Sequence, residues 1–255
     1  MMKFRIITTL SIVAILGLLA SNLYFGSSWL WILLPITIWL LVTAIGSFIM
    51  SYNYFLTSFI SSNSIISKKI ALTFDDGPHP ELTYSILDVL DRFNAKATFF
   101  CIGKQIEKYP EVLKEIAKRG HAIGNHSYSH SNFIDFSSQR KWLEEIRKTD
   151  SIIKKSIGES SNLFRPPFGV TTPNLAKAIK ETKHHVIGWD NRSFDTVLKN
   201  KTLVLKRIVK HISPGGIILF HDTQPNTVYV LERLLIHLKQ HQFEAVTINN
   251  LLDEM

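Results

Sequence analysis

The most restrictive feature of this chain is a long uncharged stretch near its beginning. Between Ile6 and Ser67 there is no Lys, Arg, Asp, Glu or His. Two apolar runs lie inside it, Ile6 to Phe25 and Trp29 to Met50. Each has the roughly 20 residues that a helix needs to cross a hydrocarbon core about 30 Å thick. Gly26-Ser27-Ser28 would form the turn between them. The pattern predicts a transmembrane helical hairpin, so a lipid bilayer is the expected partner and the membrane the expected location.

The side of the membrane on which the rest of the chain lies depends on the number of spans. Lys3 and Arg5 favour a cytoplasmic N-terminus, and two spans would return the chain to the cytoplasm, in agreement with Lys68 and Lys69. A cleaved signal peptide is disfavoured, because Leu18-Leu19-Ala20 fits a cleavage site poorly. Only an outside N-terminus, or one run that fails to span, places the remaining chain outside. The charges alone leave this choice open.

After a membrane anchor over 1–57 we expect a Ser/Asn-rich linker over 58–67 and one domain over 68–255. In that domain strand and helix patterns alternate with short turns, which is typical of a parallel α/β fold. A closed or nearly closed βα barrel is favoured over an open doubly wound sheet, because no glycine-rich phosphate loop follows the first strand. The expected strands are 69–74, 96–101, 122–125, 163–165, 185–189, 216–220 and 244–248. The expected helices are 81–93, 104–119 with a break at Pro110, 138–157, 173–180, 202–212 and 228–240.

Charge and cysteine content exclude some classes of protein. The net charge of the whole chain is +8, with 29 Lys and Arg against 21 Asp and Glu, and the basic residues are spread along the sequence. No nucleic-acid-binding motif accompanies them, so we expect no nucleic-acid partner and at most weak attraction to an anionic lipid or polymer. Cys101 is the single cysteine and lies in an apolar run, which predicts a buried structural thiol and excludes an internal disulfide.

Chemically active side chains follow the expected strands. Asp75 and Asp76 follow the first strand, just before Gly77-Pro78, a turn that could bring both carboxylates to one cleft as a metal ligand and a proton acceptor. The alternative is a solvated turn that caps the next helix. In a parallel barrel the carboxyl ends of all strands share one face, where barrel enzymes have their active sites. The other polar residues at strand ends are His126, His130, Arg165, Asp195 and His221.

Two histidines, His126 and His130, are four residues apart and would lie one above the other if the segment were helical. Such a pair can bind one divalent ion, and a carboxylate from Asp76 would complete three ligands with open positions for water, the pattern of a catalytic zinc site. The chain has ten histidines, so this spacing also arises by chance. A second pair, His237 and His241, lies on an amphipathic helix and is predicted to be a surface pair.

Five short motifs, taken in order, resemble the polysaccharide deacetylases of carbohydrate esterase family four. The resemblance spans roughly Lys68 to Leu252. It implies a distorted seven-stranded βα barrel and metal-dependent removal of an N-acetyl, sometimes an O-acetyl, group from a sugar. The motifs are Thr73-Phe74-Asp75-Asp76-Gly77, His126-Ser127-Tyr128-Ser129-His130, Arg165-Pro166-Pro167-Phe168-Gly169, the Trp189 to Asp195 region and Leu219-Phe220-His221.

The resemblance also implies roles for individual residues. Asp76, His126 and His130 would bind the metal, Asp75 would be the general base, and His221 would be the general acid. Asp195 would raise the pKa of His221, and Arg165 would orient Asp75. The Phe168 N–H would bind the oxyanion, and Leu219 would form part of the wall of the acetyl pocket. Phe168 stands where family members often have Tyr, and Thr196 where many have Trp, which leaves that wall in doubt. Arg165 could instead be a surface-loop residue, and His221-Asp222 could cap the following helix.

We therefore expect a membrane-anchored hydrolase of the cell wall that uses a divalent metal, Zn²⁺, to remove N-acetyl groups from an amino-sugar glycan such as peptidoglycan or a chitin-like polymer. One alternative is a deacylase of a lipid-linked sugar. Another is a catalytically silent barrel that binds glycans at the membrane, which would have lost some of the five residues just assigned to metal, base and acid. None of the five is missing. Because the family mostly acts on exported polymers, we favour the external face.

Overall fold

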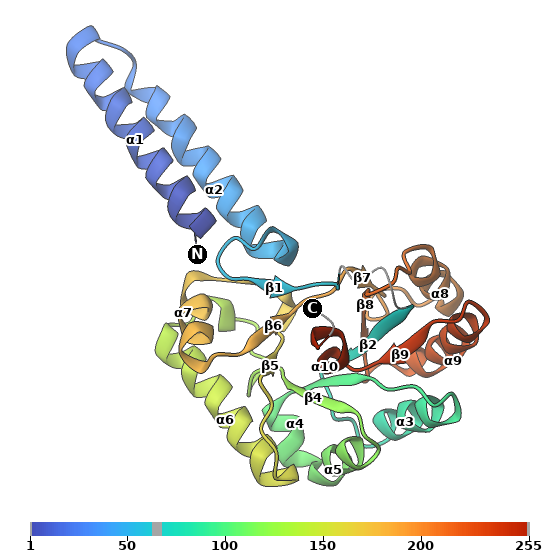
Figure 1. Ribbon diagram of the computed structural model, residues 1–255. Helices are drawn as coiled ribbons and strands as arrows, with labels where there is room; N and C mark the ends of the chain where they lie inside the picture. Colours follow the sequence, from blue (N-terminus) through green and yellow to red (C-terminus); the bar gives the residue numbers. More distant parts are fainter. Residues whose placement is uncertain (1, 63–67, 254–255) are drawn as a thin grey trace.

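A curled sheet of parallel strands lies at the centre of the computed structural model, which describes residues 2–62 and 68–253 (Figure 1). Over these residues the strand order is β1-β6-β5-β4-β3-β2-β8-β7, and β9 pairs with the start of β2. Strands β2 to β6 follow each other without the reversal that defines a doubly wound sheet, so the barrel-like alternative is the correct one. The strands are β1 Ser58–Phe59, β2 Lys69–Asp75, β3 Thr98–Cys101, β4 Ala122–Asn125, β5 Leu163–Phe164, β6 His185–Ile187, β7 Asn191–Arg192, β8 Ile217–His221 and β9 Glu244–Val246.

The two strands that were not expected, β1 and β7, have two residues each. β1 lies within the expected linker and pairs in parallel with β6. Just after it, the Ser62 N–H donates to the carbonyl oxygen of Gly215 at 2.8 Å. The first part of the expected linker therefore contributes a strand to the sheet, while residues 63–67 lie outside the described residues.

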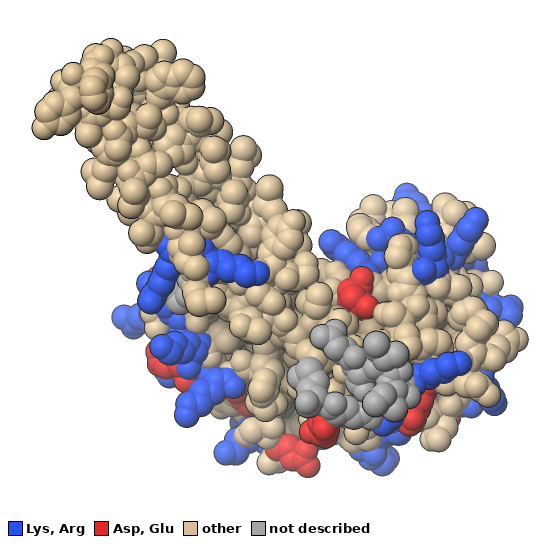
Figure 2. Space-filling view, turned by 45° about the horizontal axis from the view of Figure 1, so that its top comes forward, with Lys and Arg blue, Asp and Glu red and all other residues tan. Residues whose placement is uncertain are grey.

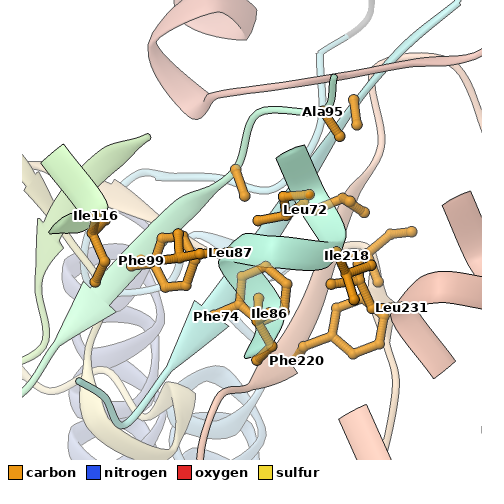
Figure 3. Close-up of a cluster of buried hydrophobic side chains, with 14 of the residues drawn as sticks. Leu72, Phe74, Ile86, Leu87, Ala95, Phe99, Ile116, Ile218, Phe220 and Leu231 are labelled. Atoms are coloured by element: carbon orange, nitrogen blue, oxygen red, sulfur yellow. The ribbon is translucent and has the colours of Figure 1, made fainter. Parts of the chain in front are cut away.

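Helices surround the sheet and bury the side chains that point away from the barrel interior (Figure 1). Alternation along β2 sends Phe74 outward, where its ring stacks between Phe99 at 5.0 Å and Phe220 at 5.6 Å (Figure 3). The expected helix at 228–240 begins three residues earlier, with Pro225 in its first turn. The helices are α3 Leu82–Arg92, α4 Gly103–Lys108, α5 Pro110–Lys118, α6 Gln139–Ile157, α7 Pro173–Thr182, α8 Lys201–Lys210, α9 Pro225–Gln240 and α10 Ile248–Leu252.

Strand register determines which side chains meet inside the barrel. In the β2–β8 ladder Asp75 pairs with His221 and Thr73 pairs with Leu219. Neighbours in a parallel ladder point to the same side of the sheet, and Phe74 points outward, so these four side chains share the inner side. Asp75 and His221 are the last residues of their strands, which places them at the carboxyl end of the sheet.

Two apolar helical segments project from the barrel as an antiparallel pair (Figure 1). They are α1 Met2–Phe25 and the continuous pair η1 Trp29–Ile32 and α2 Leu33–Phe48. Both segments are long and apolar enough to cross a membrane, and 0% and 6% of their most apolar windows are buried in the protein. Figure 2 shows Lys and Arg side chains at the base of this pair and none along its length. At the base, Lys3 Nζ donates to the Tyr52 carbonyl oxygen at 2.7 Å, so the start of α1 lies beside the end of α2.

Candidate active site

The two aspartates at the end of β2 face the same histidine. Asp75 is the last strand residue, and Asp76 has φ 76°, a left-handed conformation that redirects its side chain. His126 Nε2 consequently lies 3.8 Å from Asp75 Oδ2 and 3.6 Å from Asp76 Oδ1. Gly77 is required by packing, because a Cβ atom at this position would lie 2.1 Å from Asp222 Oδ2. The turn expected from Gly77-Pro78 therefore depends on the backbone of Asp76 as well.

His126 and His130 lie in a loop, not on a helix. Ser127 and His130 have φ values of 62° and 46°, and the two imidazole rings are 4.9 Å apart. Glu145 of α6, 2% exposed, holds the loop: its Oε2 accepts the two backbone N–H groups that precede His130, at 3.0 and 2.7 Å. The two histidines are therefore brought together by a loop that the buried Glu145 carboxylate holds, and not by the spacing of a helix.

Asp76, His126 and His130 form a group whose ligand atoms all lie within 4.8 Å of one another. Asp76 Oδ1 is 3.6 Å from His126 Nε2 and 3.4 Å from His130 Nε2. Ligands about 2.1 Å from a tetrahedral zinc ion are about 3.4 Å apart, so this donor set fits such an ion. His126 Nδ1 donates to the Arg165 carbonyl oxygen at 2.8 Å, which leaves its Nε2 lone pair directed at the group.

Electrostatics keep two of these three ligands in their metal-binding protonation states. Burial opposes the charge of Asp76, but the hydrogen bond and charge of His126, with smaller contributions from His221 and His130, lower its pKa to about 2. Burial lowers the pKa of His130 below its usual value, and repulsion from His126 adds to this effect. For His126 burial again acts to lower the pKa, yet the charges of Asp75 and Asp76 raise it. A metal ion would compete with that proton for the Nε2 atom.

Asp75 is held by Arg165, which is fully buried inside the barrel. Arg165 Nη1 donates to Asp75 Oδ1 and to Thr73 Oγ1, each at 2.8 Å. The guanidinium also donates to the backbone oxygens of Ile187, the last residue of β6, and of Gly188. It lies 4.2 Å from the centre of the Phe100 ring and 5.6 Å from that of Trp189. The charge of Arg165 is thus paired, four of its five N–H groups are hydrogen-bonded, and the Oδ2 atom of Asp75 remains directed toward His126. Arg165 is not a surface-loop residue.

A second acid–base pair, His221 and Asp195, lies at the same end of the barrel. His221 Nδ1 and Asp195 Oδ1 are 2.8 Å apart, and the His221 backbone N–H donates to Asp195 Oδ2, also at 2.8 Å. Thr227 Oγ1 donates to the same oxygen at 2.9 Å. Burial acts to lower the pKa of His221, but the hydrogen bond and charge of Asp195 raise it above its usual value. His221 is therefore cationic over a wider pH range than a free histidine.

The remaining predicted residues lie nearby with different exposures. Phe168 is 49% exposed, has φ 57°, and its ring centre is 4.7 Å from that of His130. Gly169, at φ 70°, allows the close approach of Trp189, because a Cβ would lie 2.4 Å from the indole ring. Leu219 is buried on the inner side of β8, whereas Thr196 is exposed.

The structure thus brings all nine predicted site residues to one end of the sheet. Sequence reasoning missed Thr73, Trp189 and Glu145 as supporting residues. Thr73 and Trp189 lie inside the recognised motifs, which is the signal that could have identified them. Glu145 is a single carboxylate in an otherwise ordinary amphipathic helix, and nothing in the sequence marks it. The surface pair His237 and His241 lies on α9 with ring centres 4.0 Å apart, and no carboxylate completes a metal-binding group there among the described residues.

Comparison with known proteins identifies the family. The family model described as "Polysaccharide deacetylase" matches residues 63–187. A peptidoglycan-N-acetylglucosamine deacetylase of Bacillus cereus is 34% identical over 184 residues, which are 71% of this chain and 66% of that protein. A second deacetylase of that name and species is 34% identical over 190 residues, 72% of this chain and 88% of the relative. The chain belongs to the polysaccharide deacetylase family.

Further relatives differ in length and in chemistry. The chain matches PdaC of Bacillus subtilis, a peptidoglycan-N-acetylmuramic acid deacetylase, at 35% identity but covers only 38% of its length. The solved PdaC structure has a TM-score of 0.70 at 33% identity, covering 74% of this chain and 92% of that one. A Bacillus anthracis pseudoenzyme of the same esterase family has a TM-score of 0.71 at 27% identity, covering 76% and 69%. An acetyl xylan esterase of Clostridium thermocellum in complex with cobalt has a TM-score of 0.68 at 32% identity, covering 72% and 90%.

Proposed function

We propose that this protein is a membrane-anchored, metal-dependent hydrolase that removes N-acetyl groups from amino-sugar residues of peptidoglycan or a chitin-like glycan. One observation carries the proposal: a group that fits a metal ion lies between two hydrogen-bonded acid–base pairs, Asp75 with Arg165 and His221 with Asp195. Amide hydrolysis involves two proton transfers, one from the attacking water and one to the leaving amine, and the two pairs offer one group for each.

Asp76, His126 and His130 would hold the divalent metal, for which we propose Zn²⁺. When bound, the metal supplies Lewis acidity that favours ionisation of water and stabilises negative charge on the acetyl oxygen. Within this chain, Glu145 keeps the His126–His130 loop in place, and the Arg165 carbonyl oxygen fixes the His126 tautomer.

Asp75 would accept the proton of the attacking water. Its Oδ1 is occupied by Arg165, so Oδ2 is the basic atom available to the site. Attack forms the new C–O bond at the acetyl carbon. The backbone N–H of Phe168 would donate to the oxygen that gains negative charge, while buried Leu219 would form part of the wall beside the acetyl methyl group.

His221 would protonate the nitrogen when the C–N bond breaks. An amine is a poor leaving group unless it is protonated, and the Asp195 carboxylate maintains the imidazolium for this purpose. The overall reaction adds one water to the amide and gives acetate and a protonated amino group on the sugar. The proton that Asp75 takes up offsets the one that His221 gives, and its release to solvent and the uptake of another by His221 restore both groups, so atoms and charge balance.

Product analysis tests this proposal. The full chain in detergent should release acetate from peptidoglycan and from N-acetylglucosamine oligomers, with one new free amine per acetate. Analysis of the treated glycan should show whether glucosamine or muramic acid residues have lost the acetyl group. The B. cereus relative is named for the first sugar and the B. subtilis relative for the second. No release from either glycan, while a known deacetylase releases acetate under the same conditions, would contradict the proposal and favour a silent barrel, such as the B. anthracis pseudoenzyme.

A lipid-linked acetylated sugar is a second candidate substrate, favoured by a contact between the site and the apolar helices. The Thr171 N–H, three residues after Phe168, donates to the carbonyl oxygen of Ser47 near the end of α2 at 2.9 Å. If α2 spans a bilayer, the site lies close to its surface. Faster acetate release from a lipid-linked sugar than from the matching soluble sugar would support this candidate, and equal rates would exclude it.

We further propose that residues 1–57 anchor the chain, that residues 68–255 form the catalytic domain, and that this domain lies on the external face. Because α1 and α2 are antiparallel, the N-terminus and the domain share one side of the membrane, so Lys3 and Arg5 argue for the cytoplasm. A peptidoglycan substrate argues for the outside and decides our choice. A reporter enzyme fused after Met255 that is active only in the cytoplasm would overturn it.

A further inference from the structure

Few large apolar side chains are exposed outside the apolar helices, and two of them lie in the loop that follows His130. Among the described residues after Tyr52, the exposed ones are Phe133, Phe136, Phe168, Val197 and Leu203. The most exposed are Phe133 at 77% and Phe136 at 87%. Both lie in the segment 131–138, which we call the η3 loop after its 3₁₀ helix, Ile134–Phe136. This loop directly follows the proposed metal ligand His130.

Local geometry turns the two rings outward together. Residues three apart lie on one side of a 3₁₀ turn, so Phe133 and Phe136 share a side that Ile134 does not. Ile134 is 2% exposed and belongs to the hydrophobic cluster that also contains Met50, Tyr54 and Phe55. The burial of Ile134 thus fixes the η3 loop, and the two phenylalanines remain in solvent.

The same cluster joins the η3 loop to the base of the apolar helices. Phe4 of α1 packs against it, with its ring centre 5.8 Å from that of Tyr54 and 5.1 Å from that of Phe55. At the other end of the loop, Asn174 Nδ2 of α7 donates to the Ser137 carbonyl oxygen at 3.0 Å. α7 follows Thr171, which contacts the end of α2, and Figure 1 shows α7 beside the base of the helix pair.

We propose that Phe133 and Phe136 form a second membrane contact, inserting into the headgroup region of the bilayer that α1 and α2 span. This inference rests on the membrane placement proposed above. Aromatic rings are favoured at that depth, and the contact between Lys3 and Tyr52 marks the level at which the helix pair leaves the hydrocarbon. Because the η3 loop directly follows His130, its insertion would hold the candidate active site close to the membrane surface.

Stacking of a sugar ring on Phe133 and Phe136 is the competing explanation. Two observations favour the membrane: Ile134 belongs to the same hydrophobic cluster as residues at the base of the helices, and Asn174 of α7, which lies beside that base (Figure 1), holds the Ser137 carbonyl oxygen. Both place the η3 loop on the side of the barrel that carries the anchor. Phe168, whose ring contacts His130, is the exposed phenylalanine that faces the proposed metal ligands.

Fluorescence of the full chain in lipid vesicles tests the proposal. Phe136→Cys would be labelled with an environment-sensitive fluorophore, and the native Cys101 is fully buried and should not react. Lys118→Cys on α5, with a side chain 78% exposed, serves as the control. Nitroxide-labelled lipid should quench most of the fluorescence at position 136 and little at position 118. Equal quenching at both positions, in protein that floats with the vesicles, would overturn this inference and leave the membrane anchor intact. Protein that does not float with vesicles would overturn both.

Activity separates the membrane from the glycan. The double variant Phe133→Ser/Phe136→Ser should release acetate from soluble oligomers at the wild-type rate, and several-fold more slowly from an acetylated amino sugar carried on vesicle lipid. An equal decrease in the rate of acetate release with both substrates would show that the two rings bind sugar, and would overturn the proposal.

Discussion

In the proposed mechanism Asp195 acts through His221, to which it is hydrogen-bonded. A general acid must be protonated to act, so activity falls as pH rises past its pKa, and the Asp195 carboxylate holds that pKa above the usual value. Asp195→Asn removes the charge and should move the alkaline limb of the kcat–pH profile to lower pH, with a loss of about 10–100-fold near neutrality.

The control for this prediction is Thr227→Val. It removes one hydrogen bond to Asp195 Oδ2 but keeps the carboxylate charge, so the alkaline limb should move less. An alkaline limb at the same pH in Asp195→Asn and in the wild type would show that His221 is not the acid.

Asp222 lies under the active-site turn and affects stability. Burial raises the pKa of its carboxyl to about 7, and the carboxyl accepts a hydrogen bond from Thr83 Oγ1 at 2.5 Å. The folded protein thus keeps this proton to about pH 7, whereas the unfolded chain loses it near 3.8. Because the folded state binds more protons over this range, this carboxyl lowers the stability as pH rises from about 4 to 7.

Asp222→Asn should remove that dependence. The stability of the variant relative to wild type should rise between pH 4 and pH 8, by up to about 4 kcal/mol. Denaturant unfolding at the two pH values measures it. A stability difference that is the same at both would show that Asp222 is ionised in the folded protein.

At the scale of elements, the segment of residues 49–62, which follows α2, packs on the barrel. Its side chains Tyr54 and Phe55 are 4% and 1% exposed, and β1 completes one edge of the sheet. A fragment that begins at Ser62 lacks Tyr54, Phe55 and β1, whereas a fragment that begins at Ser51 contains them. Loss of a single buried aromatic side chain typically costs about 3–5 kcal/mol, so the shorter fragment should unfold at a clearly lower temperature.

Phe55→Ala in the longer fragment is the matched comparison, and it should reproduce a large part of the loss in unfolding temperature. Circular dichroism on heating measures all three proteins. Equal unfolding temperatures for the two fragments would mean that the segment packs on the barrel without stabilising it.

Most elements could be predicted because their patterns are local. The seven expected strands are present, since each is a short apolar run bounded by turn residues. β1 could not be predicted, because it has only two residues and lies in an uncharged stretch that reads as membrane flank. The His126–His130 loop could not be distinguished from a helix by spacing, because its shape depends on positive φ values and on Glu145, a distant carboxylate.

For the molecule as a whole, the apolar helices and the site form one continuous arrangement. The end of α2 contacts the loop that follows Phe168, and the start of α1 packs on residues that also hold the η3 loop. The sequence predicted both parts separately, from an uncharged stretch and from five motifs. It could not predict their contact, because that depends on tertiary structure: the hydrogen bond from Thr171 to Ser47 and a hydrophobic cluster that includes both Ile134 and Tyr54.

The proposed activity requires that a metal held by Asp76, His126 and His130 acts together with Asp75 as the base. The most direct test measures acetate release from N-acetylglucosamine oligomers by the full chain, with metal content determined on the same samples. Chelation should abolish release, and added Zn²⁺ should restore it in proportion to metal bound, up to one ion per chain. Asp75→Asn should bind the ion without turnover. Undiminished release by metal-free protein, or by Asp75→Asn, would contradict the account.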